Sequence, residues 1–439
     1  MPEKETTRSG LKGFLFKNIS VLFLLLLLAG YGAVYIYNFN SPPIRSDGEG
    51  YYAYLPSYFI HGDFYMDKLA EQKYGGSFPQ WTGIQKFPGT GHWIDKYPIG
   101  ESLLMSPFFF IADVLTRTFH YVRDGYSLFY QYAAGLAGVF YAAAGLYALQ
   151  RLLSKYCSKK ATVLALIAVL FGTDLFHYAT YDSIFSHAFS FFLFGLFFLQ
   201  VIKWYEKPGF GRSVFLGFVM GLIFLVKIPD SIIWIFWLLF GITSFRAVKN
   251  RLSFYRDNLK AVTSLFAALL LTILPQFLIW EKLTNKILIN PYLSETFTNL
   301  TSPQIMNVLF SPAKGLFFWS PILVFSVIGF FFLSKKMRFF LTPVVLFLCL
   351  HLYLVSSWWD WGFGGSYGHR AFVEAMPIFA LGMASFVDEL KAGWQKITAY
   401  VIGCFLIIIN LFLMFQYWRG VIPFSGTDLN TFFNVFKVW

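Results

Sequence analysis

The run Ile19–Tyr37, ISVLFLLLLLAGYGAVYIY, decides the fold class, because it is long and apolar enough to cross a bilayer as one helix. Four cationic residues precede it: Lys4, Arg8, Lys12 and Lys17. Such a flank is typical of the cytoplasmic end of a membrane span. A signal peptide has a similar flank, but this run is long and continues through aromatic residues. We therefore predict an uncleaved first span with residues 1–18 in the cytoplasm.

The composition of the whole chain extends this prediction. The 439 residues are 57% hydrophobic and 13% charged, which is more apolar surface than a soluble fold can bury. Apolar runs of suitable length lie at 19–38, 126–150, 161–177, 183–203, 212–227, 230–246, 259–280, 314–333, 338–356, 371–388 and 397–417. Because every backbone group inside a bilayer needs an internal hydrogen bond, these runs predict helices. The expected fold is an all-α polytopic membrane protein with about 11 transmembrane helices and further juxtamembrane helices at the outer face.

A twelfth run, 99–117, is expected to lie along the outer membrane surface or to re-enter it. If it spanned, the basic segments around Arg151–Lys160, Arg246–Lys260 and Lys335–Arg338 would face outward, against the positive-inside rule. With this choice, the surplus behind the net charge of +12 is cytoplasmic, where anionic lipid attracts it, and no nucleic-acid partner is expected.

The predicted organisation is therefore a single transmembrane domain at 19–417. It carries a large first outer loop at 38–125 and is followed by a short non-cytoplasmic tail at 418–439. This topology places several polar motifs on one face. Ser46-Asp47-Gly48-Glu49-Gly50-Tyr51-Tyr52 follows the first span, and Gly364-Gly365-Ser366-Tyr367-Gly368-His369-Arg370 follows the Trp-rich segment 358–361. Carboxylates, cations and aromatic rings suit a sugar site, because rings stack on pyranoses and carboxylates accept from hydroxyls.

Simpler explanations exist for each motif. Asp47 has the position of a turn or N-cap residue, and the tryptophans fit an interfacial aromatic belt. Arg370 and Glu374 have the i,i+4 spacing of an ordinary helical ion pair. Within the apolar runs, His187 is able to bond a neighbouring helix. Lys227 and Asp230 have a spacing that lets them neutralise one another.

Three further segments complete the pattern: Lys96-Tyr97-Pro98-Ile99-Gly100, Ser186-His187-Ala188-Phe189-Ser190-Phe191 and Ser311-Pro312-Ala313-Lys314-Gly315-Leu316-Phe317. In this order, the five segments resemble the GT-C superfamily of polyprenyl-phosphate-sugar-dependent glycosyltransferases. The resemblance is to the bacterial branch related to protein O-mannosyltransferases and aminoarabinose transferases, and it covers most of the chain. The sequence departs from that pattern at Lys227-Ile228-Pro229-Asp230, where many relatives have arginine before the proline.

The resemblance implies a membrane glycosyltransferase. It would move a monosaccharide from a polyprenyl-phosphate donor to a glycolipid, glycan or protein acceptor, with inversion, at the periplasmic face of the inner membrane. Asp47 is then the expected general base. The expected ligands of the donor phosphate are Lys96, Arg370, His369 and Lys314. The expected contacts of the sugar or the acceptor are Glu49, Tyr51, Tyr52, Asp95, Tyr97, Asp182, His187 and Trp359. No cofactor is required, and a divalent metal at some of these acids is an open alternative.

Two other functions also fit the sequence. A transporter or flippase of lipid-linked sugars needs polar groups through the membrane, and here those groups are sparse while the outer loops are rich in them. An oligosaccharide ligase or polymerase needs the same acids, cations and rings, so the sequence discriminates poorly against it. A non-catalytic scaffold would not require Asp47. The sugar, the acceptor and the oligomeric state are not readable from the sequence.

Overall fold

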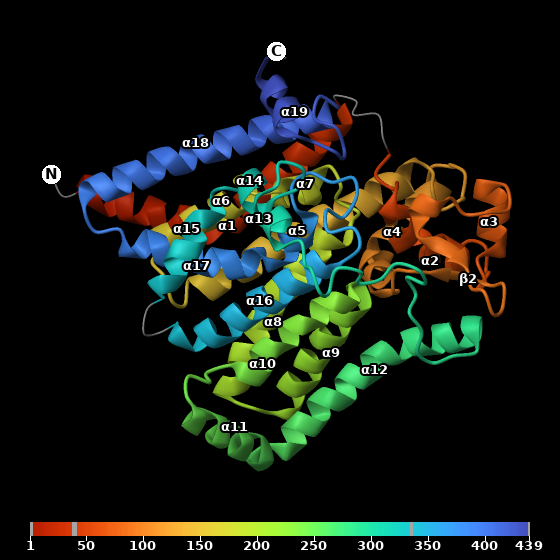
Figure 1. Ribbon diagram of the computed structural model, residues 1–439, viewed down its shortest axis with the longest axis horizontal. Coiled ribbons are helices and arrows are strands. Elements are labelled where there is room, and N and C mark those ends of the chain that lie inside the picture. Colours follow the sequence, from red (N-terminus) through yellow and green to blue (C-terminus); the bar gives the residue numbers. More distant parts are fainter. Residues whose placement is uncertain (1–2, 37–41, 334–336, 438–439) are drawn as a thin grey trace.

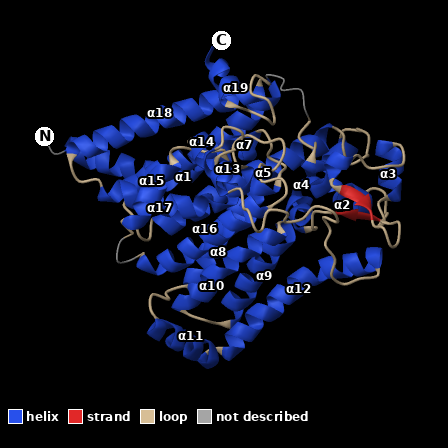
Figure 2. Cartoon of the chain, in the orientation of Figure 1, coloured by secondary structure: helices blue, strands red, loops and turns tan. Residues whose placement is uncertain are grey.

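The computed structural model describes residues 3–36, 42–333 and 337–437, and almost all of their regular structure is helical (Figure 2). The single sheet in these ranges is two-stranded: β1 (Ile84–Lys86) pairs antiparallel with β2 (Trp93–Asp95). The all-α prediction is therefore confirmed, with one short hairpin added in the first long loop. Residues 37–41 and 438–439, at the edges of the first predicted outer loop and of the tail, lie outside the described residues.

Nine helices have 14 residues or more: α1 (Glu3–Ile36), α4 (Gly100–Thr118), α5 (Leu128–Leu153), α8 (Ser186–Glu206), α9 (Phe210–Val226), α12 (Leu259–Thr284), α16 (Leu341–Ser357), α17 (Met376–Glu389) and α18 (Gly393–Trp418), within the described ranges. The shorter helices are α2 (Asp47–Phe59), α3 (Asp67–Tyr74), α6 (Lys159–Phe171), α7 (Leu175–Thr180), α10 (Ile235–Leu239), α11 (Phe245–Asp257), α13 (Ile305–Phe310), α14 (Leu316–Trp319), α15 (Leu323–Phe331) and α19 (Leu429–Asn434). The 3₁₀ segments are η1 (Gln80–Thr82), η2 (Ile228–Trp234), η3 (Arg338–Phe340), η4 (Arg370–Ala375) and η5 (Val435–Lys437).

Seven helical segments in the described part are long and apolar enough to cross a membrane. They are Asn18–Ile36, Leu128–Leu153, Ser186–Glu206, Leu259–Thr284, Arg338–Ser357, Arg370–Glu389 and Gly393–Trp418. The other four predicted runs form shorter helices, α6, α9, η2 with α10, and α15; Gly172 is the C-cap of α6, Pro229 follows the end of α9, and Pro321 precedes α15. The chain is a multi-pass membrane protein. The helix α4 is not among the seven, and its place at the membrane surface stays a prediction.

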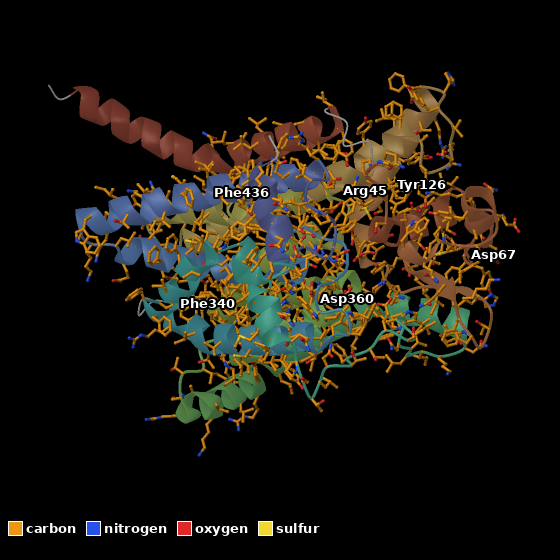
Figure 3. The ribbon with its side chains drawn as sticks, turned by 45° about the horizontal axis from the view of Figure 1, so that its top comes forward. Arg45, Asp67, Tyr126, Phe340, Asp360 and Phe436 are labelled. Carbon is orange, nitrogen blue, oxygen red and sulfur yellow. The ribbon has the colours of Figure 1, made fainter. Side chains whose placement is uncertain are left out.

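The elements of the first long loop gather at one end of the helical bundle. In Figure 1, α2, α3, α4 and β2 lie at the right, while the start of α1 lies at the left. Figure 3 shows Arg45, Tyr126 and Asp67 toward the same end, with Phe340 toward the other. Side chains that are far apart in sequence are thus brought to one end of the protein.

Glycines allow the central helices to approach closely. A Cβ on Gly138 of α5 would lie 1.6 Å from the carbonyl oxygen of Ser183, just before α8. A Cβ on Gly329 of α15 would lie 1.8 Å from the carbonyl oxygen of Gly382 in α17. Small residues at such crossings are the usual means of packing helices in lipid, because the backbones can then touch. The close packing fixes the helix ends that carry the polar side chains.

Candidate active site

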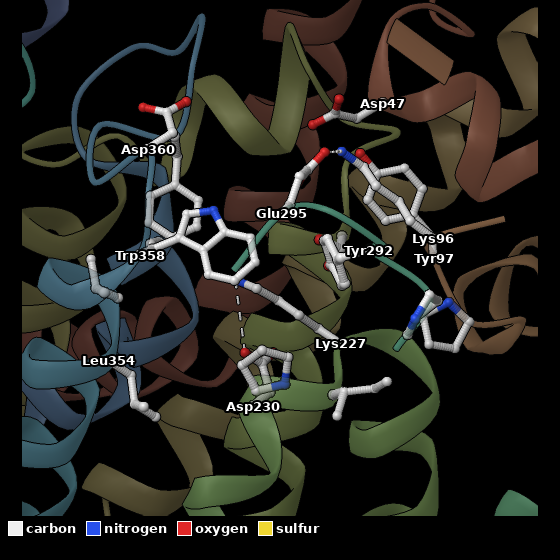
Figure 4. Close-up of a pocket in the computed structure, with 18 of the residues that line it drawn as sticks. Asp47, Lys96, Tyr97, Lys227, Asp230, Tyr292, Glu295, Leu354, Trp358 and Asp360 are labelled. Atoms are coloured by element: carbon white, nitrogen blue, oxygen red, sulfur yellow. Dashed lines mark hydrogen bonds and ion pairs between the residues drawn. The ribbon is translucent and has the colours of Figure 1, made fainter. Parts of the chain in front are cut away.

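A cavity of about 530 Å³ lies where α2, α8, the break between α9 and η2, α16 and η4 meet the loop segments 96–98, 289–297 and 358–364 (Figure 4). This volume is within the range of small-molecule sites. The residues predicted from the sequence that line it are Asp47, Tyr51, Lys96, Tyr97, His187, Trp359 and Arg370. Four of the five sequence segments therefore contribute to one cavity.

Asp47 and Arg370 form an ion pair at the cavity wall. The Arg370 Nη1 donates to the Asp47 Oδ2 over 2.9 Å, and the two side chains are 16% and 20% exposed. Asp47 is the first residue of α2, and the N-cap position is held by Ser46, so Asp47 is not the N-cap. A Cβ on Gly50 of the same motif would lie 2.2 Å from the Thr82 carbonyl oxygen, so the glycine lets α2 pack tightly behind Asp47.

Two tyrosines form the wall beside this pair. The rings of Tyr51 and Tyr97 pack with their centroids 4.1 Å apart, and the Ser186 hydroxyl donates to the Tyr51 hydroxyl over 3.2 Å. Burial raises the pKa of both tyrosines, so both stay phenols at neutral pH. Their ring faces give the cavity an apolar platform beside its charged groups.

A buried ionic network forms the floor. The helix α9 ends at Val226, and Lys227 adopts an extended conformation before Pro229. Its ammonium pairs with Glu374 and lies 3.8 Å from the Asp230 carboxylate. Glu374 also bonds the His187 Nδ1 at 3.2 Å. Glu374 therefore pairs with Lys227 and His187, and Arg370 pairs with Asp47 instead of making the i,i+4 pair with Glu374.

The loop at 285–304 crosses the mouth of the cavity between α12 and α13. Its Glu295 carboxylate lies 3.3 Å from the Lys96 ammonium, and its Thr296 carbonyl accepts from the Trp359 N–H over 3.2 Å. Figure 4 shows the Glu295 carboxylate beside the Lys96 ammonium, with Asp47 above them and Tyr292 below. Glu295 and Trp358 also line the cavity but were not among the site residues predicted from the sequence. Lys227 and Asp230 line it too, and the sequence does indicate a functional role for them, because charged residues inside apolar runs are costly and usually functional.

Three predicted contacts of the sugar point away from the cavity. Glu49 pairs with Lys73 at 3.2 Å and accepts from Tyr74. Tyr52 is fully buried and donates to the Gly125 carbonyl over 2.7 Å. Asp95 is 3% exposed and accepts from the Tyr97 N–H over 2.9 Å. Burial raises the pKa of Asp95 to about 8. All three hold the first long loop in place.

Asp182 belongs to a separate group of side chains, here called the closed cluster: Arg45, Asp182, His177 and Trp418. Asp182 accepts from Arg45 at 2.7 Å and from the His177 Nε2 at 2.9 Å, and the Trp418 indole donates to the His177 Nδ1 over 2.9 Å. Burial lowers the pKa of His177, so the ring is neutral. Burial opposes ionisation of Asp182, but Arg45 and His177 outweigh it and hold its pKa below the usual range. None of the four lines the cavity.

Lys314 and His369 lie behind the cavity. The Lys314 ammonium donates to the carbonyls of Ser366 and Phe424, the second over 2.6 Å. Burial, reinforced by Arg370, lowers the pKa of Lys314 to about 7. His369 is 1% exposed, and burial lowers its pKa to about 3. Neither side chain lines the cavity, so their predicted contact with a phosphate remains a prediction.

Within the described ranges, no group of three or more His, Cys, Asp or Glu side chains is placed to hold a metal ion. Three carboxylates that line the cavity lie beside cations: Asp47 pairs with Arg370, Glu295 with Lys96, and Asp230 lies 3.8 Å from Lys227.

No protein family and no curated protein matches this chain in sequence. A solved structure does match: the archaeal oligosaccharyltransferase AglB from Archaeoglobus fulgidus, in complex with an inhibitory peptide and a dolichol-phosphate. The TM-score is 0.53 at 12% sequence identity, over 94% of this chain and 57% of that one. The fold is GT-C-like. The chain spans a little more than half the length of AglB. At this level of identity the likeness shows the fold, and the chemistry has to be argued from the residues of the cavity.

Proposed function

We propose that this protein is a membrane glycosyltransferase that takes a monosaccharide from a polyprenyl-phosphate donor. The observation that carries the proposal is the cavity, where three cations, Lys96, Lys227 and Arg370, converge with the carboxylate of Asp47. An enzyme of this kind must hold a lipid phosphate whose charge grows as the glycosidic bond breaks. It must also place a base within reach of the acceptor hydroxyl.

The three cations supply the phosphate site. Arg370 presents a planar guanidinium that binds two phosphate oxygens at once, and Lys227 and Lys96 add point charges from the floor and the mouth. The apolar side chains Ile228, Leu354 and Val355 line the same cavity and suit the first isoprene units. This combination supports a lipid-linked phosphate over a nucleotide sugar.

Asp47 serves as the base. A phosphate on Arg370 takes over the guanidinium that now binds Asp47, and the carboxylate is released toward the acceptor. The acceptor hydroxyl then gives its proton to Asp47 and its oxygen attacks the anomeric carbon. The bond from that carbon to the phosphate oxygen breaks, and its electron pair leaves with polyprenyl phosphate. Attack opposite the leaving group inverts the anomeric centre.

Aromatic rings complete the site. Tyr51, Tyr97, Trp358 and Trp359 line the cavity, and such rings stack on the apolar faces of a sugar. AglB was solved with a peptide and a dolichol-phosphate, which supports a cavity of this fold receiving both a lipid phosphate and an acceptor. We place the reaction at the periplasmic face of the inner membrane, with a glycolipid, glycan or protein as acceptor.

The deciding experiment follows release of free polyprenyl phosphate from a panel of polyprenyl-phosphate monosaccharides. We expect one donor to be consumed by the wild type, and Asp47→Asn to lower its turnover about 10²- to 10⁴-fold while donor binding survives. Asp67→Asn, an exposed acid on α3, is the matched control and should leave turnover unchanged. An active Asp47→Asn variant contradicts the role of Asp47. Movement of the donor across vesicles without its consumption would favour a flippase.

A further inference from the structure

Each cation that lines the cavity is paired with a carboxylate from another part of the chain. The pairs are Arg370 with Asp47, Lys227 with Glu374 and Lys96 with Glu295. A phosphate that enters the cavity must therefore compete with carboxylates for the cations. The pair that a phosphate breaks most easily is the one that is least buried.

The pairs differ most at the floor and the mouth. Glu374 is fully buried, and breaking its pair with Lys227 would leave an uncompensated charge away from water, which is strongly unfavourable. The Glu295 side chain is 31% exposed and that of Lys96 is 18% exposed. Ion pairs in contact with water are weak because solvent screens them and solvates the released groups. The Lys96–Glu295 pair is therefore the one that a phosphate displaces most easily.

The surroundings keep Lys96 at the cavity when Glu295 leaves it. The Lys96 ammonium lies 5.3 Å from the centroid of Tyr97 and 5.7 Å from that of Tyr292, so two rings hold its charge by cation–π attraction. Its own position directly follows β2, whose hairpin packs on α12. Lys96 is thus fixed, while its partner is able to move.

Glu295, by contrast, is carried by an irregular loop that is fixed at its far end. The Asn299 N–H donates to the Ser357 carbonyl over 3.0 Å, and the Gln304 N–H donates to the Ser356 carbonyl over 2.8 Å. Glu295 itself lies in a turn in which its N–H donates to the Tyr292 carbonyl over 3.1 Å. A change at Glu295 therefore needs only a local shift of the turn and leaves the attachment to α16 intact.

We propose that Glu295 is a specificity-determining residue that competes with an anionic head group for Lys96, so that it weakens the binding of a lipid phosphate and leaves the binding of the neutral lipid alcohol unchanged. The identity of the ligand rests on the proposed function. A phosphate replaces the carboxylate on Lys96, whereas an uncharged head group leaves the Lys96–Glu295 pair closed. Removing the charge of Glu295 ends this competition for Lys96.

The test measures the affinity of the purified protein for polyprenyl phosphate and for polyprenol. We expect Glu295→Gln to bind polyprenyl phosphate about 2- to 5-fold more tightly, the range of a partly exposed ion pair, with polyprenol binding unchanged. Lys96→Met should bind polyprenyl phosphate more weakly. The double variant should equal Lys96→Met, because Glu295 acts only through Lys96.

Asp360→Asn is the matched control, since it removes one negative charge from the same lining and makes no ion pair with Lys96. If Asp360→Asn tightens binding as much as Glu295→Gln, general electrostatics explains the gain and the proposal falls. An unchanged or weaker affinity of Glu295→Gln also overturns it. If the wild type prefers neither lipid, the proposed donor class itself is wrong, which is a different result from a failure of Glu295 alone.

Discussion

Two groups of side chains in this protein are built from the same residue types, and they have opposite character. The closed cluster joins Asp182 to Arg45, His177 and Trp418 through contacts of 2.7–2.9 Å. The cavity wall joins Asp47 to Arg370 through one bond of 2.9 Å beside about 530 Å³ of space. An acid, an arginine and aromatic rings are thus a structural clamp in one place and a candidate site in the other.

The difference teaches that available space and uncommitted hydrogen-bonding capacity decide the role of such residues. Both Asp182 oxygens accept bonds from cationic or ring donors, and both ring nitrogens of His177 are engaged, so nothing is left for a ligand. Among the described residues, Asp47 accepts one hydrogen bond, at Oδ2 from Arg370, and its side chain reaches the cavity. The following changes test this contrast.

The largest expected effect is on stability, in the closed cluster. Asp182→Ala leaves Arg45 without its carboxylate in a mostly buried site, which should lower the free energy of unfolding by about 3–5 kcal/mol. Protein that remains folded at low temperature should still consume donor. Thermal unfolding in detergent and donor turnover at that temperature check both points. Lost turnover with unchanged stability would place Asp182 in the site and break the contrast.

The second effect is on donor binding. Arg370→Gln removes a charged fork from the cavity, and a hydrogen bond to a charged group contributes about 1.5–3 kcal/mol, so donor affinity should fall roughly 10- to 100-fold. Arg45→Gln, the matched change in the closed cluster, should leave donor affinity unchanged. An equal loss of donor affinity in both variants would contradict a role for Arg370 that depends on its position in the cavity.

A third effect concerns Asp95, a buried carboxyl that has neither cavity nor ion pair. Its Oδ2 has no hydrogen-bond partner among the described residues. Its pKa of about 8 exceeds the unfolded value of about 3.9, so the folded state holds a proton that the unfolded state releases. This contribution to stability is complete below pH 4 and is lost as the pH rises to 8, by about 1.4 kcal/mol per pH unit. The melting temperature of Asp95→Asn minus that of the wild type should therefore increase as the pH rises from 4 to 8. A difference that does not change with pH would contradict the raised pKa of Asp95.

The smallest effect concerns Trp359, which is 50% exposed at the cavity. Trp359→Ala should weaken acceptor or sugar binding by about 1 kcal/mol, seen as a roughly fivefold higher KM, with no change in melting temperature. Trp418→Phe should lower the melting temperature and leave KM unchanged, because it removes the hydrogen bond to His177 and leaves the cavity intact. A lower melting temperature for Trp359→Ala would indicate that the ring is a packing residue.

Much of the fold was predictable, because lipid admits only apolar helices and each apolar run in the sequence corresponds to a helix. The convergence of Asp47, Lys96 and Arg370 was also predictable, since topology brought their segments to one face. Glu295 was not, because the path of its loop depends on contacts with α16 and the first long loop that no local pattern reports. Asp182 and Lys314 were predicted to contact the ligand, but neither lines the cavity. A sequence places a residue near a site without giving the direction of its side chain.

The chain's last residues have a practical consequence that follows from Lys314. The Phe424 carbonyl is one of two acceptors for that buried ammonium, and Phe432 packs on Phe318 and Trp319. The tail after α18 is therefore folded into the protein body and braces the loop before Arg370. Shortening the protein at Trp418 to ease purification would remove this brace, so affinity tags belong after the tail and not in its place.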